Sequence, residues 1–191
     1  EKPGDEHWED FINELANIQK LNAQASKDSD AEEKACDVWR KAIETSPHAI
    51  TPRINLARFL EERARNSVDR SIAEGLLQQA IGFAEDTVKV MPQGHQNSGL
   101  AFSCCASVHY SLYDVRGELA DIDAAIECAQ KATCDESDVN LWDHYRLLAQ
   151  ALILRYERLN RGDDLRDASA AVMMGLSKCP AEDMHSKIQC M

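Results

Sequence analysis

The sequence predicts an all-α fold made of about four antiparallel helical hairpins. Apolar residues recur at helical spacing over most of the chain, and no strand-like alternation competes with that pattern. Helical patterns also end at regular intervals of 45, 45 and 43 residues, at Pro47, Pro92, Ser137 and Pro180. A repeated interval of this length is typical of stacked helical hairpins, as in α-solenoids.

A second landmark supports the repeat. A small residue on the first helix of each hairpin recurs at Ala16, Ala57, Ala106 and Ala149. It precedes the closing residue by 31 positions in the first, third and fourth hairpins, and by 35 in the second. The chain is therefore expected to form a single helical-repeat domain over residues 1–191. Its predicted hairpins are 5–47, 48–92, 97–137 and 141–180, followed by a tail over 181–191.

The first two hairpins each show two amphipathic helices. In the first hairpin, the apolar face of one helix is predicted to meet that of the other: Trp8, Phe11, Ile12, Leu15, Ile18 and Leu21 against Cys36, Val38, Trp39, Ala42 and Ile43. The corresponding pair of faces in the second is Leu56, Phe59 and Leu60 against Leu76, Leu77, Ala80, Ile81 and Ala84. Thr51 followed by Pro52 predicts the N-cap and N1 residues of the second hairpin.

The last two hairpins are predicted to have helices at 101–113, 122–132, 141–159 and 165–176. The segment RYERLNRGDDL, residues 155–165, lies at the turn of the fourth hairpin. Asp163 or Asp164 is expected to cap the incoming helix, and Gly162 to adopt the left-handed conformation that ends the outgoing one. Arg155 and Arg158 are expected to pair with Asp164 or Asp167. A phosphate-binding loop is disfavoured, because the segment has one glycine and no preceding strand.

The fourth hairpin resembles the extended tetratricopeptide-like repeats of fungal proteins, which often accompany CHAT caspase-like or NLR-type nucleotide-binding domains. The residues that carry this resemblance are Leu148, Ala149, Leu152, Arg155, Tyr156, Arg158, Asp164, Leu165 and Ala168. The third hairpin follows the pattern without its arginines, and the first two follow it weakly. The resemblance implies a right-handed superhelical stack. It also implies that the first helix of each hairpin lines a concave face.

Composition and residue spacing argue against several functions. The formal net charge of -12 is unlike that of most nucleic-acid binders and disfavours docking on anionic membranes. The seven cysteines form no metal-ligand spacing, and Cys105 with His109 is a metal-like pair without further ligands. No catalytic residue, metal or cofactor is expected. The cysteine pattern favours a reduced intracellular setting, most simply the cytoplasm. The opening Glu-Lys-Pro-Gly, without Met, suggests a segment of a longer protein.

The expected function is a non-catalytic scaffold that binds a protein or an extended, partly acidic peptide. The tetratricopeptide pattern places these residues on the concave face: Asn13, Asn17, Ile54, Arg58, Ser103, Ser107, Tyr110, Arg146 and Gln150. One alternative is self-association through an apolar outer side of the helix at 165–176. Another is a small-molecule pocket among Ser103, Tyr110 and Arg146. The acidic excess of residues 1–46 and 96–140, each with a net charge of -6, offers an outer surface for a basic partner.

Overall fold

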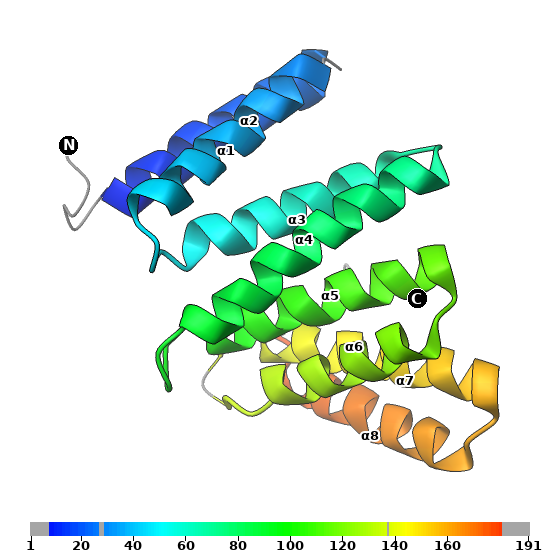
Figure 1. Cartoon of the computed structure of the whole chain (residues 1–191). Helices are drawn as coiled ribbons and strands as arrows, with labels where there is room; N and C mark the ends of the chain where they lie inside the picture. The colour runs from blue at the N-terminus through cyan, green and yellow to red at the C-terminus, as the bar shows by residue number, and fades with distance from the viewer. Residues whose placement is uncertain (1–7, 27–28, 137, 181–191) are drawn as a thin grey trace. The chain divides into compact units, whose positions relative to one another are not determined.

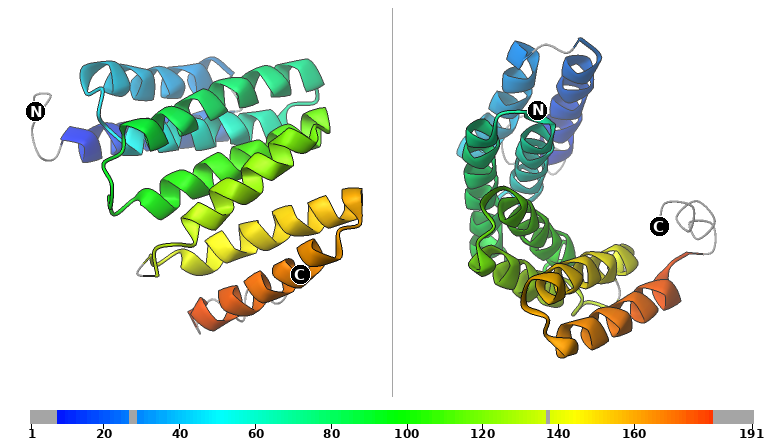
Figure 2. Two further views of the ribbon diagram at one scale, coloured as in Figure 1. Left: turned by 60° about the horizontal axis from the view of Figure 1, so that its bottom comes forward. Right: turned by 90° about the vertical axis from the view of Figure 1, so that its right-hand side faces the viewer.

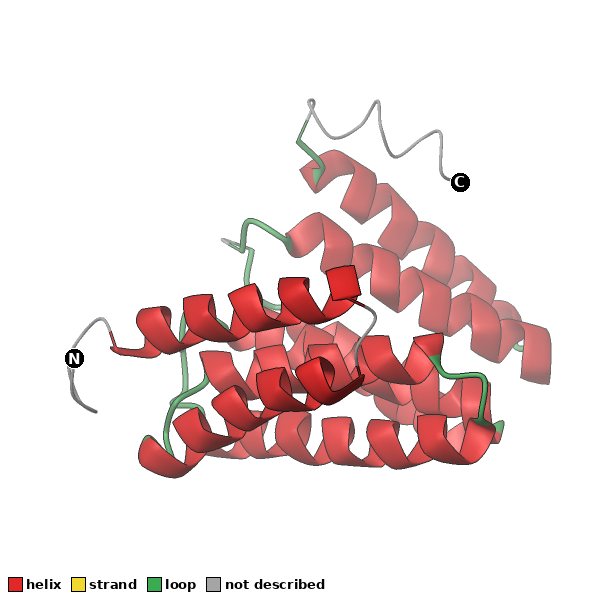
Figure 3. Ribbon diagram, turned by 90° about the horizontal axis from the view of Figure 1, so that it is seen from above, coloured by secondary structure: helices red, strands yellow, loops and turns green. Residues whose placement is uncertain are grey.

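The computed structural model describes residues 8–26, 29–136 and 138–180, and over these ranges the chain is all-α, as predicted (Figures 1 and 3). The helices are α1 (Trp8–Ser26), α2 (Ser29–Thr45), α3 (Thr51–Asn66), α4 (Arg70–Val90), α5 (Ser98–Arg116), α6 (Leu119–Ala132), α7 (Leu141–Leu159) and α8 (Gly162–Lys178). The predicted closing residue Ser137 and the tail 181–191 lie outside the described residues. The bounds of α7 equal the predicted ones.

The chain divides into two compact units between His95 and Gln96. Unit 1 contains α1–α4 and unit 2 contains α5–α8, and successive helices in each unit pack as pairs (Figures 1 and 2). The pairs contact each other in the same way in both units. The first helices touch (α1 with α3, α5 with α7), and the second helix of one pair touches the first helix of the next (α2 with α3, α6 with α7).

The two helix pairs of unit 2 are repeats of one another. Both bounds of α7 lie 43 residues after those of α5, and α8 begins 43 residues after α6. Asn97 and Asn140 precede the first helices with nearly equal backbone angles. Gly117 and Asn160 follow these helices in the left-handed conformation, with φ of 75° and 52°. The 43-residue interval predicted for this part of the chain is therefore present in its helices and turns.

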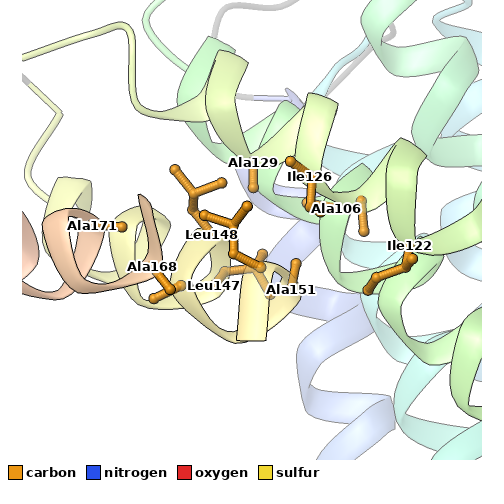
Figure 4. Packing of buried hydrophobic residues seen from close by; sticks show 12 residues of the cluster. Ala106, Ile122, Ile126, Ala129, Leu147, Leu148, Ala151, Ala168 and Ala171 are labelled. Carbon is orange, nitrogen blue, oxygen red and sulfur yellow. The ribbon is translucent and has the colours of Figure 1, made fainter. Parts of the chain in front are cut away.

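The core of unit 2 is built largely from small side chains (Figure 4). One cluster of its buried residues consists of Ala106, Ile122, Ala125, Ile126, Ala129, Leu147, Leu148, Ala149, Ala151, Leu152, Ala168 and Ala171. Alanine at a contact lets helix backbones approach closely, while leucine and isoleucine fill the space that remains. At Gly175 of α8 the approach is closer still, because an added Cβ would lie 3.2 Å from the carbonyl oxygen of Trp142 and from Cβ of Tyr145.

The core of unit 1 follows the faces predicted for the second hairpin. Leu56, Phe59 and Leu60 of α3 are buried, as are Leu77, Ala80 and Ala84 of α4. The Trp39 ring of α2 packs against the Phe59 ring of α3 with centroids 5.5 Å apart. Arg63 of α3 adds ion pairs to Glu32 (3.1 Å) and Glu33 (3.0 Å) of α2. The second pair is thus held to the first by aromatic packing and by charge.

The predicted core face of α1 was wrong for most of its residues. Phe11, Leu15, Ile18 and Leu21 are 58%, 37%, 53% and 63% exposed. The buried residues of this helix are instead Asn13 and Ala16, which lie on the side toward α2 and α3. The apolar pattern of α1 correctly indicated a helix, but most of its apolar face is not covered within the chain.

The predicted caps also need correction. Asn160, and not Gly162, adopts the left-handed conformation after α7, and Gly162 is the first residue of α8. The residue before α8 is Arg161, and no side chain caps this helix. Thr51 is likewise the first residue of α3 and not its N-cap, which is Ile50. Pro52 does lie in the first turn, where its missing N–H costs no helical hydrogen bond.

The turn between α7 and α8 is held by an ion pair, as expected for Arg155 and Asp164. The Arg155 guanidinium donates from Nε to Asp164 Oδ2 (3.1 Å) and from Nη2 to Oδ1 (2.6 Å). Its Nη1 donates to Asp123 Oδ1 of α6 (2.7 Å). The hydrogen bond to Asp164 is the largest cause of a raised pKa at Arg155, and the hydrogen bond to Asp123 raises that pKa further. One arginine therefore joins α6, α7 and α8.

We predict that Gly175→Ala lowers the free energy of unfolding by about 1–3 kcal/mol, because the new methyl group forces α7 and α8 apart. Chemical denaturation followed by circular dichroism measures the change. Gly82→Ala is the matched control, since Gly82 lies within α4 and has open space around its Cβ position. The control should be stabilised by about 0.5–1 kcal/mol through higher helix propensity. Equal effects of the two substitutions would contradict the close α7–α8 contact.

We predict that Asp164→Ala lowers the free energy of unfolding by about 1–3 kcal/mol, since the Arg155 guanidinium loses its two-point partner in a largely buried site. Asp123 remains bound to Arg155 and limits the loss. Asp163→Ala is the control, because the Asp163 side chain is 80% exposed and pairs only with Arg166 at the surface. It should change stability by less than about 0.5 kcal/mol. Similar losses of unfolding free energy in both variants would mean that Asp164 stabilises the chain only as a negative charge in the first turn of α8, and not through its bonds to Arg155.

Candidate functional site

The predicted binding residues of unit 1 differ in their accessibility. Asn17 and Arg58 are exposed, so both are available to a partner. Asn13 is buried, and its side-chain oxygen accepts a hydrogen bond from Asn55 Nδ2 (3.2 Å), which links α1 to α3. Ile54 is fully buried and belongs to the core. Asn17 and Arg58 therefore remain the accessible candidates in this unit.

The predicted residues of unit 2 lie on one face of two adjacent helices. This α5–α7 face consists of Ser103, Ser107, Tyr110 and Asp114 on α5, and Arg146, Gln150, Ile153 and Glu157 on α7. Spacings of four, three and four residues place each set along one side of its helix. Each α7 residue lies 43 positions after its α5 counterpart, and α5 contacts α7. Repetition thus produces two parallel rows of side chains.

One end of the α5–α7 face carries Arg146, whose charge is already compensated. Its Nε donates to Asp143 Oδ1 (2.7 Å), and its Nη1 donates to Gln150 Oε1 (2.8 Å). Both ion-pair partners are substantially exposed, so the bond to Asp143 adds little stability. A ligand carboxylate at this end would compete with Asp143 for the guanidinium.

The other end of the face is acidic and centres on Tyr110. The Tyr110 ring packs on the core of unit 2. Burial, and then the charges of Asp114 and Glu157, raise the pKa of its hydroxyl. Asp114 is exposed, but partial loss of its hydration raises the pKa of its carboxyl as well. Among the described residues, no cationic side chain forms an ion pair with Asp114 or Glu157.

Asp114 and Glu157 were not among the residues predicted from the sequence. Each lies four positions after a residue of the face, Tyr110 or Ile153, so helical spacing could have identified them. Helical spacing alone does not show that these two carboxylates share a face, because that depends on the contact between α5 and α7. They change the charge expected for the face, because its two carboxylates, Asp114 and Glu157, outnumber its one cation, Arg146.

The described residues offer little for metal or redox chemistry. No group of three or more His, Cys, Asp or Glu within them could hold a metal ion. His109, of the metal-like pair with Cys105, instead has Nδ1 3.8 Å from Asp121 Oδ1. Within the described residues, the cysteines form no disulfide: Cys36, Cys104, Cys105, Cys128, Cys134 and Cys179.

Among the helices in the described ranges, none is both long enough and apolar enough to cross a membrane. The sequence matches no protein-family model, and a comparison with curated proteins finds no match.

We predict that Asp114→Asn raises the midpoint of thermal unfolding slightly at pH 7. The pKa of Asp114 is higher in the folded chain than in the unfolded one, so protonation favours folding. That contribution is fully present below the ordinary pKa of 3.8 and is lost as the pH rises through the folded-state pKa. The variant should therefore be more stable than the parent at neutral pH, and the difference should vanish as the pH falls.

Thermal scans of both chains between acidic and neutral pH measure this difference. Glu44→Gln serves as the control, because Glu44 is an exposed carboxylate in unit 1, away from this face. A pH-independent effect of Asp114→Asn would show that the loss of hydration at this carboxyl does not influence folding.

Proposed function

We propose that the chain is a non-catalytic interaction scaffold that binds an extended segment of a protein partner on the α5–α7 face. The observation that carries this proposal is the pair of matched rows on adjacent helices, with polar groups at one end and Tyr110 between two carboxylates at the other. Hydroxyl and amide groups along such rows suit hydrogen bonds to the backbone of an extended peptide. The rows hold no metal-ligand cluster or nucleophile–base pair.

The charges of the face favour a partner with a lysine or arginine side chain at the Tyr110 end. Such a cation would be attracted by Asp114 and Glu157 and could lie over the Tyr110 ring. The partly acidic peptide expected from Arg58 and Arg146 is less well supported, because Arg146 is already bound by Asp143. We therefore propose a basic anchor residue, flanked by a segment that meets the Arg146–Gln150 end through its backbone.

We further propose that the helix pairs belong to a tetratricopeptide-like solenoid within a larger protein of a reducing, intracellular compartment. The 43-residue repetition of unit 2 supports the helical repeat. The same order of helix contacts in unit 1 supports its extension to that unit. The free thiols agree with a reducing compartment. The fungal CHAT- or NLR-associated setting rests on the sequence resemblance alone.

Selection from a phage-displayed library of random dodecapeptides on the immobilised chain tests the binding proposal. Enriched peptides should contain lysine or arginine. The double variant Asp114→Lys, Glu157→Lys should lose them, because attraction at the Tyr110 end becomes repulsion. Binding should also weaken as salt is added. The control, Glu44→Lys, changes an exposed carboxylate of unit 1 and should keep the same peptides.

Two results would contradict the proposal. One is the enrichment of acidic peptides that still bind the double variant but do not bind the Arg146→Glu variant. This result would support the partly acidic partner expected from the sequence. Absence of any enriched peptide, with circular dichroism showing a folded chain, would argue against peptide binding on this face.

A further inference from the structure

The last helix of the described residues, α8, repeats part of an apolar surface that α6 buries. Counting 43 residues forward from α6, Ile122 corresponds to Leu165, Ile126 to Ser169, and Ala129 to Val172. Ile122 and Ile126 are 0% and 4% exposed in the core shared with α7, whereas Leu165 is 45% exposed. Leu176, on the same side of α8, is 46% exposed. We call Leu165, Ser169, Val172 and Leu176 the α8 face; its exposed apolar residues are Leu165 and Leu176, while Val172 is half-buried and borders the core of unit 2.

The first helix carries the counterpart of this surface. Alignment of α1 with α7 at the small residues Ala16 and Ala149 sets Leu15 against Leu148, and Ile18 against Ala151. Leu148 and Ala151 are buried in the core that α7 shares with α6. Leu15 and Ile18 are exposed, together with Phe11 and Leu21. We call Phe11, Leu15, Ile18 and Leu21 the α1 face.

The α6–α7 contact inside unit 2 shows how two such surfaces fit. Ile122, Ile126 and Ala129 of α6 correspond to residues of the α8 face. They share a buried cluster with Leu148 and Ala151 of α7, which correspond to Leu15 and Ile18 of the α1 face (Figure 4). The Arg155–Asp123 ion pair joins the same two helices (2.7 Å). The described chain thus contains this kind of contact twice, between α2 and α3 and between α6 and α7. On α1 and α8 it carries the two halves of a further contact.

We propose that the chain self-associates head to tail, with the α8 face of one copy packed on the α1 face of the next. One chain supplies both halves, and rows of exposed apolar residues of this kind mark interaction surfaces. Because the two surfaces differ, the contact is heterologous, and it extends into an open chain or closes into a ring. This inference uses neither the α5–α7 face nor the partner proposed for it.

Analytical ultracentrifugation of the whole chain tests the proposal through two variants. Phe11→Glu, Ile18→Glu disables the α1 face, and Leu165→Glu, Leu176→Glu disables the α8 face. All four residues are exposed, so each variant should keep the helical circular dichroism of the parent. The parent should form species larger than a dimer as its concentration rises, while each variant alone should remain monomeric.

The decisive sample is an equimolar mixture of the two variants. Each retains the surface that the other lacks, so the mixture should form a 1:1 dimer that cannot extend further. The control, Val68→Glu, Ile72→Glu, removes exposed apolar side chains outside both faces and should associate like the parent.

Other outcomes overturn the proposal. A parent chain that stays monomeric at high concentration would mean that another segment or another protein covers these faces. Dimers of either variant alone would indicate a symmetric contact between like faces. A monomeric mixture, with a parent that does associate, would place the contact elsewhere on the chain.

Discussion

Close approach of neighbouring helices is the constraint on which the rest of this structure depends. Four helices of unit 2 share a buried cluster of twelve residues, of which seven are alanine. Such a core offers less apolar area per residue than one of leucine, so its stability depends on tight contacts over the whole helix length. Gly175 marks the point where even one methyl group would separate α7 from α8.

The same close packing explains the role of Arg155. Its guanidinium reaches Asp164 beside the α7–α8 turn and Asp123 on α6, so a single side chain fixes the spacing of three helices. Asp164 is almost fully buried, and a buried carboxylate requires a matched cation with good geometry. Two parallel N–H···O bonds supply that geometry. The segment 155–165, predicted as the turn of the fourth hairpin, is consequently part of the framework.

Repetition of one helix pair gives the chain two kinds of surface. First helices lying side by side align equivalent positions into rows, which produces the polar α5–α7 face with its acidic end at Tyr110. Among the described residues, α1 and α8 each keep exposed apolar side chains, such as Phe11 and Leu21 on α1 and Leu165 and Leu176 on α8. Polar rows suit a specific, salt-sensitive partner, and apolar rows suit extension of the stack. The proposed binding and the proposed self-association therefore involve different residues.

Helical periodicity and turn residues in the sequence determined which segments became helices. They gave the bounds of α7, the buried faces of α3 and α4, and the 43-residue repeat of unit 2, because these depend on local spacing along one chain. Only the tertiary structure decided which apolar faces are covered. Leu15 and Leu148 each precede the small residue of their helix, but Leu148 is 8% exposed in the core of unit 2 whereas Leu15 is 37% exposed.

Helix capping and surface charge also depended partly on the local sequence and partly on contacts between helices. Asp164 suits an N-cap by its position in the sequence, yet it is buried against Arg155 because α7 lies alongside. Asp114 lies one helical turn after Tyr110 on α5, but only the contact of α5 with α7 brings the Glu157 charge close enough to act on Tyr110. A helix pattern specifies which residues share a side of the helix. What that side meets depends on contacts between segments far apart in the chain, which local spacing does not encode.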